Sequence, residues 1–485
     1  MTSNLTIDPG SIDENDPAKP SRPRSGPARP SGGLFRAFWR WHFYASFLVI
    51  PVLLVLASTG LIYLLRFQIE PILHADLMKV DVPTGAQRLS YDEQAASLLE
   101  EYPDGRIAAV LEPSASNRST DFSLSTAAPG TPSWEDDTIR EVYVDPYTGE
   151  VLGELDPNKT LSGWAKTTHG NMMLGTTGEY VIELGACWAI VMAITGYYMY
   201  WRGRVARARR KVARAAGAAL RHKHATVGLF VGVGLLALVV SGLPWTVWWG
   251  AKAQEFATSQ GTSFWSEDPG AQSSAPTLDA SVPHSHNVPW GEGKSKVPTS
   301  TSTGMEPVGL DAAIATADEA GFRHPMTVVP PADDKGVYSV LSYAFNSPGH
   351  ESALHIDQFT GKPITEFGYE DYGALAKVVG QGIALHEGRR FGVLNMIVSG
   401  AFCVAVIFMC IAGPIMWWRR RPKGSRTVAA PRGRLDLKTG PMAVVGLVLL
   451  GVALPLFGAS LVAIFVLDQI ILRRVGPLKN FFNTV

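Results

Sequence analysis

The sequence has few cysteines and long stretches without charge. Its three cysteines, Cys187, Cys403 and Cys410, all lie in apolar runs, so the polar regions have no disulfide framework. Asp, Glu, Lys and Arg are absent from residues 43–65, 184–201, 225–251, 391–418 and 441–467. A helix that crosses a bilayer needs about 20 apolar residues. The chain is therefore predicted to be an integral membrane protein, with the first run retained as a membrane helix.

Several motifs that are typical of nucleotide-binding proteins, zinc peptidases and ion-coupled transporters are also missing. The sequence contains no Walker A motif, no G-x-G-x-x-G after a predicted strand and no H-E-x-x-H, so no nucleotide site and no zincin site are predicted. No charged residue lies in the middle of an apolar run, whereas ion-coupled transporters and proton pumps usually need one. The candidate chemistry must come from other side chains.

The basic residues predict an orientation, although the formal net charge of the chain is zero. Arginines and lysines collect before the first apolar run, between the second and third, and after the fourth. Short loops rich in Lys and Arg stay in the cytoplasm. The N-terminus is therefore expected in the cytoplasm and the region 68–168 outside. The position of the arginine-rich stretch between two membrane helices favours this role over nucleic-acid binding.

The chain divides into segments by composition. The tail 1–33 is expected to be disordered, and the membrane segments are 34–67, 169–202, 224–251 and 386–420, the second and last including an amphipathic lead-in. The other segments are the first outside module 68–168, cytoplasmic loops 203–223 and 421–440, a flexible linker 252–304 and the second outside module 305–385. The C-terminal segment 441–475 carries Pro455 near its centre, and one kinked crossing is favoured over a re-entrant hairpin.

The two outside modules have the pattern of α+β structure. Helices are predicted for 91–102 and 310–320, and strands for 106–111, 141–144 and 353–356. Each late strand runs into a turn with the pattern Asp-x-aromatic-Thr-Gly, in which Gly supplies a positive φ. The fold class is thus a membrane helical bundle of four core helices in two parallel repeats, plus a C-terminal hydrophobic segment, with two extracytoplasmic α+β modules.

Four histidines recur in register within the duplication. His42 is followed at +17 and +18 by Thr59-Gly60, and His224 by Ser241-Gly242 at the same offsets. His169 and His386 each have Gly at +6 and +27, Trp at +32 and Arg at +33. Helix direction places His42 and His224 near the cytoplasmic face and His169 and His386 near the outer face. A parallel repeat relates the members of each pair about one axis along the membrane normal.

Paired imidazoles at one depth can bind one haem iron from opposite sides. The histidine pairs therefore predict two haems, an inner one held by His42 and His224 and an outer one held by His169 and His386. His222 is a weaker alternative to His224, because it breaks the register with His42. Arg389 and Arg390 are candidate partners for the outer haem's propionates. A capping or interfacial role for the histidines remains the alternative.

The sequence resembles the PepSY-associated transmembrane family, which includes iron-regulated membrane proteins and ferrisiderophore reductases. The resemblance spans about residues 34–475 and is carried by the stretches Trp39-Arg40-Trp41-His42, Val144-Asp145-Pro146-Tyr147-Thr148-Gly149-Glu150-Val151, His169-Gly170, His224 with Ser241-Gly242-Leu243-Pro244-Trp245, and Leu385-His386-Glu387-Gly388 with Trp417-Trp418-Arg419-Arg420. It implies a bacterial inner-membrane protein with a four-helix core that binds haem b, two PepSY modules outside, and reduction of extracytoplasmic ferric complexes.

These observations lead to one functional expectation and two alternatives. The expectation is transmembrane electron transfer that reduces a ferric siderophore or another extracytoplasmic acceptor. Some relatives carry a fused flavin reductase domain that this chain lacks, so the cytoplasmic electron donor would be a separate protein or a soluble reductant. The alternatives are a regulatory protein whose PepSY modules inhibit a peptidase, and a transporter of iron complexes.

Overall fold

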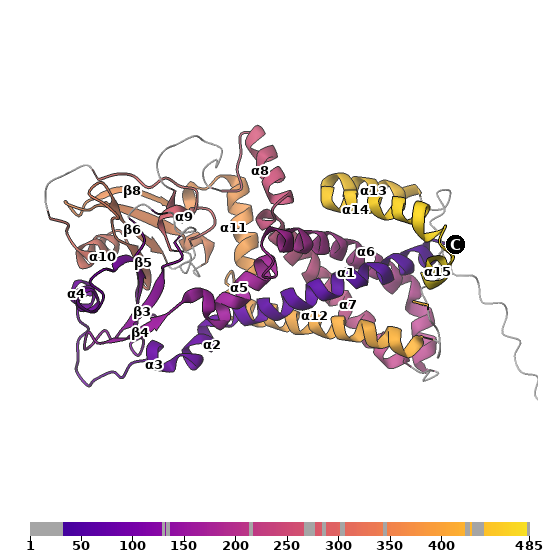
Figure 1. Ribbon diagram of the computed structural model, residues 1–485, viewed down its shortest axis with the longest axis horizontal. Coiled ribbons are helices and arrows are strands. Elements are labelled where there is room, and N and C mark those ends of the chain that lie inside the picture. The colour runs from indigo at the N-terminus through magenta and orange to yellow at the C-terminus, as the bar shows by residue number, and fades with distance from the viewer. Residues whose placement is uncertain are drawn as a thin grey trace, which may run out of the picture.

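The computed structural model shows an elongated molecule, with a β-sheet at one end and a bundle of long helices at the other (Figure 1). It describes residues 33–482 except 129–130, 132–135, 213–216, 266–276, 284–287, 301–305, 343–346, 422–426 and 429–440. The predicted tail lies outside the described residues except for Gly33, and so does most of the loop expected at 421–440. We call the end of the bundle next to the sheet the sheet end. We call the opposite end, where two of the long helices finish with Arg209, Arg210 and Lys211 and with Arg419 and Arg420, the basic end.

Four long helices form the bundle: α1 (Gly33–Leu64), α6 (Thr176–Val212), α7 (Ala218–Gly242) and α12 (Gly392–Arg420). α1 packs against α6 and α12, and α7 packs against the same two helices. The first helices of the two repeats therefore lie diagonally across the bundle, as a parallel duplication requires. These helices and the stretch Pro455–Leu472 are long and apolar enough to cross a membrane.

The C-terminal segment does not form the one kinked helix that was expected. It folds into two helices, α13 (Pro441–Ala453) and α14 (Pro455–Leu467), that lie side by side (Figure 1). Pro455 starts α14, and a Cβ on Gly458 would come within 2.5 Å of the Gly451 carbonyl oxygen, so glycine lets the two helices meet closely. The chain then returns to the basic end, where Arg40 donates a hydrogen bond to the carbonyl of Phe482.

The eight strands found in the described residues form one continuous antiparallel sheet in the order β4-β3-β2-β1-β5-β6-β7-β8. The first module contributes β1 (Arg106–Leu111), β2 (Thr120–Ser125), β3 (Arg140–Val144) and β4 (Val151–Leu155). The second contributes β5 (Met326–Val329), β6 (Val337–Ser342), β7 (Ser352–Asp357) and β8 (Pro363–Gly368). The two modules are thus halves of one structure, because β1 pairs with β5 through Val110↔Val328 and Leu111↔Thr327.

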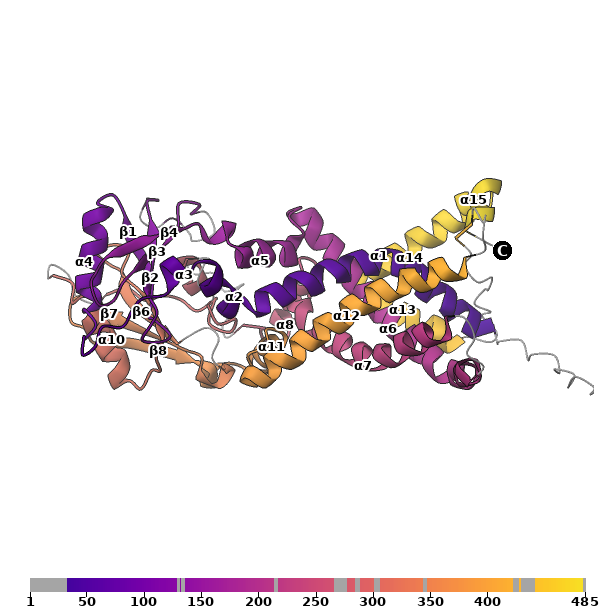
Figure 2. The same ribbon diagram turned by 90° about the horizontal axis from the view of Figure 1, so that it is seen from below.

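Helices α4 (Tyr91–Glu101) and α10 (Leu310–Glu319) cover the sheet face farther from the bundle (Figures 1 and 2). They cap each other reciprocally: Asp92 accepts from the backbone N–H groups of Leu310 and Asp311, and Asp311 accepts from those of Tyr91 and Asp92. Each carboxylate satisfies N–H groups that the first turn of a helix leaves unpaired. This exchange ties the two modules together about their pseudo-twofold axis.

The other sheet face receives part of the region expected as a flexible linker. Leu278 of α9 (Leu278–Ser281) and Val282 are buried in a cluster with Ala109, Leu341 and Ala353. These apolar side chains leave water on packing, which favours an ordered course for this part of the chain. The remaining residues expected as linker include α8 (Trp249–Ser259), which is helical, and stretches outside the described residues.

Short helices connect the sheet to the bundle. α5 (Leu161–Asn171) packs against α1, and α11 (Ala374–His386) packs against α7. Gly175 and Gly392, at the same register of the two repeats, have φ of 55° and 56° in the turns that lead into α6 and α12. The other short helical elements are α2 (Arg66–Leu73), α3 (Ala75–Met78), α15 (Gly476–Phe481), four 3-10 turns, η1 (Pro157–Lys159), η2 (Leu243–Trp245), η3 (Pro348–His350) and η4 (Tyr369–Asp371), and a π-helical turn, η5 (Asp468–Leu472).

Candidate functional site

The outer histidine pair meets at the sheet end of the bundle. His169 on α5 and His386 at the end of α11 have ring centroids 6.3 Å apart, with ring planes at 83°. A metal–imidazole bond is about 2 Å, and a ring nitrogen lies about 1.1 Å from its ring centre, given ring bonds of about 1.35 Å. Two imidazoles that bind one metal ion from opposite sides would therefore have centres about 6.2 Å apart. Directly hydrogen-bonded rings would lie closer, at about 5 Å.

A hydroxyl group from the neighbouring long helix holds each outer histidine. Thr59 Oγ1 on α1 lies 3.1 Å from His169 Nδ1, and Ser241 Oγ on α7 lies 3.1 Å from His386 Nδ1. The carbonyl of Leu238 also lies 3.1 Å from His386 Nδ1, so this nitrogen must be the protonated donor. Thr59 Oγ1 donates to the Val55 carbonyl and can therefore accept from His169. Both rings keep Nε2 unprotonated, the form that binds a metal.

Glycine makes room for both outer rings. A Cβ on Gly60 would lie 3.1 Å from His169 Cε1, and a Cβ on Gly242 would lie 3.4 Å from His386 Cε1. The repeated Thr/Ser-Gly dipeptide at +17 and +18 thus has a structural meaning. Its hydroxyl orients a histidine of the same repeat, and its glycine lets that ring approach the helix backbone.

Burial keeps the outer histidines neutral. Burial, reinforced by the nearby His386, lowers the pKa of His169 from 6.5 to about 4. Burial also lowers the pKa of His386. At neutral pH both imidazoles therefore retain the lone pair that a metal ligand needs.

His42 of the inner pair has the same kind of support on α6. Its Nδ1 lies 3.0 Å from the Met192 carbonyl and 3.2 Å from Thr195 Oγ1. A Cβ on Gly196 would lie 3.3 Å from His42 Cε1. Thr195-Gly196 therefore acts for His42 as Thr59-Gly60 acts for His169. The sequence marked Gly196 through its repeated offset, whereas the role of Thr195 was missed.

His224 differs from the other three histidines. It lies close enough to His42 for the two rings to interact electrostatically. Its Nδ1 is buried and has no hydrogen-bond partner in the described part of the chain. In the register of the second repeat, Ala412, a residue without a hydroxyl, stands where the first repeat has Thr195. The inner pair is thus held asymmetrically.

His222, the weaker alternative, lies beside a lysine and lines a cavity. Its Nε2 lies 3.3 Å from Lys211 Nζ. Together with Lys223, Thr226, Val227 and Phe408 it lines a cavity of about 330 Å³ between α7 and α12. The geometry therefore favours His224 as the inner partner of His42.

The two candidate propionate partners have different surroundings. Arg389 is buried and lies 2.9 Å from a Glu351 carboxylate oxygen and 2.7 Å from one of Glu387. This pairing fixes the turn after His386 to the segment that precedes β7. The Arg390 guanidinium lies over the Phe391 ring, 4.8 Å from its centre. Arg390 is therefore the better placed of the two for an additional anion.

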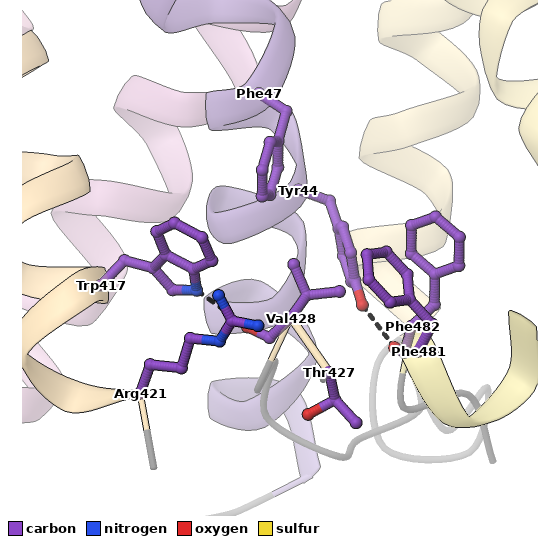
Figure 3. Close-up of a pocket in the computed structure, with 8 residues that line it drawn as sticks. All are labelled: Tyr44, Phe47, Trp417, Arg421, Thr427, Val428, Phe481 and Phe482. Atoms are coloured by element: carbon purple, nitrogen blue, oxygen red, sulfur yellow. Dashed lines mark hydrogen bonds between the residues drawn. The ribbon is translucent and has the colours of Figure 1, made fainter. Parts of the chain in front are cut away.

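A larger cavity of about 500 Å³ lies at the basic end, between α1, α12 and the C-terminal residues (Figure 3). Its lining is mostly aromatic: Tyr44, Phe47, Trp417, Phe481 and Phe482, with Arg421, Thr427 and Val428. Tyr44 and Trp417 use their polar atoms to donate to the carbonyls of Phe482 and Val428. Residues two apart on a helix point in nearly opposite directions, so this cavity lies on the side of α1 away from His42.

The fold and the histidine pairs define a multi-pass helical membrane protein with an α+β region at one end of its bundle. Residues 39–420 match the family model of the PepSY-associated TM region, and the chain belongs to this family. A comparison with curated proteins gave no match.

Proposed function

We propose that this protein binds haem b between each histidine pair and uses it to reduce a ferric complex outside the cytoplasmic membrane. The observation that carries the proposal is the 6.3 Å separation of the His169 and His386 ring centres. That gap is too wide for a hydrogen bond between the rings and has the size that a shared metal ion requires.

The ligand set favours haem over a bare metal ion. Among the described residues, no group of three or more His, Cys, Asp or Glu side chains is placed to hold a metal ion. Structural zinc sites use four protein ligands, so two histidines alone are too few. A porphyrin supplies the equatorial nitrogens itself and needs only axial ligands from the protein. His169 and His386 would hold the outer haem, and His42 and His224 the inner one.

The protein side chains set the properties of these sites. Thr59, Ser241 and Thr195 orient the imidazoles through Nδ1, leaving Nε2 available to the iron. The orphaned Nδ1 of His224 predicts a weaker ligand at the inner site. Haem, when bound, supplies a one-electron redox centre near each end of the bundle.

The overall reaction adds one electron to Fe(III) in an external chelate and gives Fe(II), which oxygen ligands hold less tightly. The electron would come from a cytoplasmic donor at the basic end, which we assign to the cytoplasmic side because short loops rich in Lys and Arg usually stay there. A ferrisiderophore is the acceptor class that the resemblance to ferrisiderophore reductases implies.

One observation weighs against the transporter alternative. Glu183, a fully buried carboxylate in α6, accepts hydrogen bonds from the backbone N–H groups of Trp248 and Trp249 at 3.0 and 3.1 Å. It therefore caps the start of α8 and is already used in structure. An ion-coupled transporter would need such a group to face its ion path.

The experiment starts with purified protein reduced by dithionite and then freed of excess reductant without oxygen. Addition of a ferric siderophore should reoxidise the protein and produce Fe(II) that an Fe(II)-specific dye traps, one Fe(II) for each haem oxidised. His386→Ala should lose this activity, and His350→Ala, at a position in the sheet region, should keep it. Reduced protein that does not react faster than buffer would overturn the proposal.

A further inference from the structure

A chain of aromatic rings leads from the outer histidine pair to the protein surface. The His386 ring lies 5.8 Å from the Trp245 ring, and Trp245 lies 5.6 Å from Trp290, both edge to face. Trp290 is stacked on Trp265, with centres 4.8 Å apart and planes at 22°. The four residues come from α11, from η2 at the end of α7, and from two separate stretches beyond α8. Tertiary folding therefore assembles this cluster.

The ordinary role of tryptophan at a membrane surface explains only part of the cluster. Trp245 ends α7, where interfacial tryptophans are common. Trp265 and Trp290 lie farther along the chain, and their stacking on each other does not follow from a position at the end of a membrane helix. The Trp290 indole N–H donates to the Phe264 carbonyl at 3.1 Å, which fixes the ring. The cluster is thus held in place by its own contacts.

The cluster is accessible and close to the outer site. Trp245 is 43% exposed although it touches the His386 ring, and Trp265 and Trp290 are partly exposed. Indole faces bind planar aromatic rings at centre distances of about 4.5–7 Å. A ring stacked here would lie only one or two ring contacts from the outer histidines. Such short contacts suit electron transfer out of the protein.

We propose that Trp245, Trp265 and Trp290 form the docking surface for the acceptor, and that the acceptor is a ferric chelate whose iron-binding groups are aromatic, such as catecholates. Docking presents the chelate's rings to the indoles and its iron to the outer pair. The acceptor's role rests on the proposed function, whereas docking itself needs no electron transfer. An aliphatic hydroxamate chelate has no ring to stack and should bind weakly.

The test measures binding with redox-inert probes. Gallium(III) has the charge of Fe(III) but is not reduced under these conditions, so its complexes report docking alone. We would titrate a gallium tris-catecholate and a gallium trihydroxamate into the full-length protein in lipid nanodiscs by calorimetry. The catecholate should bind at least about tenfold more tightly, as expected from one to two aromatic contacts.

Matched tryptophan variants locate the binding surface. Trp265→Leu and Trp290→Leu should each weaken catecholate binding by about tenfold. Trp418→Leu, a change of an exposed tryptophan at the basic end, should leave it unchanged. An unchanged haem spectrum and unfolding temperature would show that each variant folds. If Trp290→Leu does not fold, Trp265→Leu alone provides the test. Equal affinity for the two chelates, or binding that neither variant weakens, would overturn the docking proposal.

The outcomes separate docking from reduction. Tight catecholate binding without Fe(II) production would refute the reductase and leave the docking surface intact. Reduction of both chelate classes at one rate, insensitive to the tryptophan variants, would refute the docking surface and leave the reductase intact.

Discussion

Thr59 Oγ1 lies 3.1 Å from His169 Nδ1, and this contact joins α1 to α5 in the first repeat. Ser241 and His386 make the same contact at the same distance between α7 and α11 in the second repeat. The hydroxyl comes from a long helix and the imidazole from the short helix that follows the sheet module. The contact therefore places each outer histidine relative to the bundle. Because the two repeats face each other, it also places the two rings relative to each other.

Removal of these hydroxyls should change the outer haem's reduction potential. An acceptor at Nδ1 makes an imidazole a stronger electron donor and favours Fe(III). Thr59→Val and Ser241→Ala should each raise the outer potential, by an amount on the order of tens of millivolts, the equivalent of about one hydrogen bond. Potentiometric titration followed by absorption spectroscopy measures this. An unchanged or lowered potential in both variants would contradict the assigned role of the hydroxyls.

Ala412→Thr adds a hydroxyl at the inner site, the reverse of the hydroxyl removals at the outer site. Thr195 lies 3.2 Å from His42 Nδ1 through its hydroxyl, and Ala412 occupies the matching position in the register of the second repeat. A hydroxyl there should give the buried Nδ1 of His224 a partner, lower the inner potential and leave the outer one unchanged. Ala412→Val, of similar size but without the hydroxyl, is the control. Equal effects of the two substitutions would show that volume, and not hydrogen bonding, is responsible.

Gly60→Val should displace His169. The Cβ alone would lie 3.1 Å from the ring, tighter than an ordinary van der Waals contact, and the two methyl groups need further space. The expected result is a haem content reduced by about half, because the inner pair is untouched. Gly446→Val on α13 is the matched control, since a Cβ there meets nothing within 4 Å. Full haem content in Gly60→Val, measured after extraction, would argue against the close approach.

The seam between the two sheet modules should depend on pH through His324. Its Nδ1 lies 2.7 Å from Glu112, which follows β1, and its Nε2 lies 2.9 Å from Asp318 on α10. Burial alone would lower the pKa of His324, but Glu112 and Asp318 outweigh it and raise the pKa above 6.5. The contribution of protonated His324 to the free energy of unfolding is therefore complete below pH 6.5. It is lost as pH rises through the raised pKa of His324 in the folded state.

The unfolding temperature of the purified protein checks this prediction. Between about pH 6 and pH 8, the wild type should lose more stability than His324→Gln, because only the wild type loses a charged pair. At the acidic end the variant should be the less stable of the two. Parallel pH profiles for the two proteins would mean that His324 does not stabilise the seam.

The sequence predicted those features that depend on local pattern. Uncharged runs indicated α1, α6, α7 and α12, and alternating residues indicated β1, β3 and β7. The pairing of β1 with β5 could not be predicted, because it joins strands of different modules and leaves no local signal. One kinked helix was predicted where the structure has α13 and α14, because Pro455 is compatible with a kinked helix as well as with a turn. The close approach of Gly451 and Gly458 decides between them.

At the candidate site, too, the sequence predicted only the features that follow from the register of the repeat. Register alone brought together His169 and His386, whose ring centroids lie 6.3 Å apart, and it marked the glycines beside three of the rings. The pairing of His42 with His224 around one iron stays a prediction. The backbone carbonyls of Met192 and Leu238 could not be found, because a carbonyl carries no sequence signature. The tryptophan cluster beside His386 was also missed, since Trp265 and Trp290 lie in a region whose composition indicated only a linker.

The absorption spectrum of the purified protein from haem-replete cells tests the central claim most directly, with haem counted per chain before and after reduction by dithionite. The wild type should show a Soret band with sharp α and β bands on reduction, and His386→Ala should retain about half the haem because only the outer pair is broken. A colourless wild-type protein, or full haem content in His386→Ala, would contradict the account.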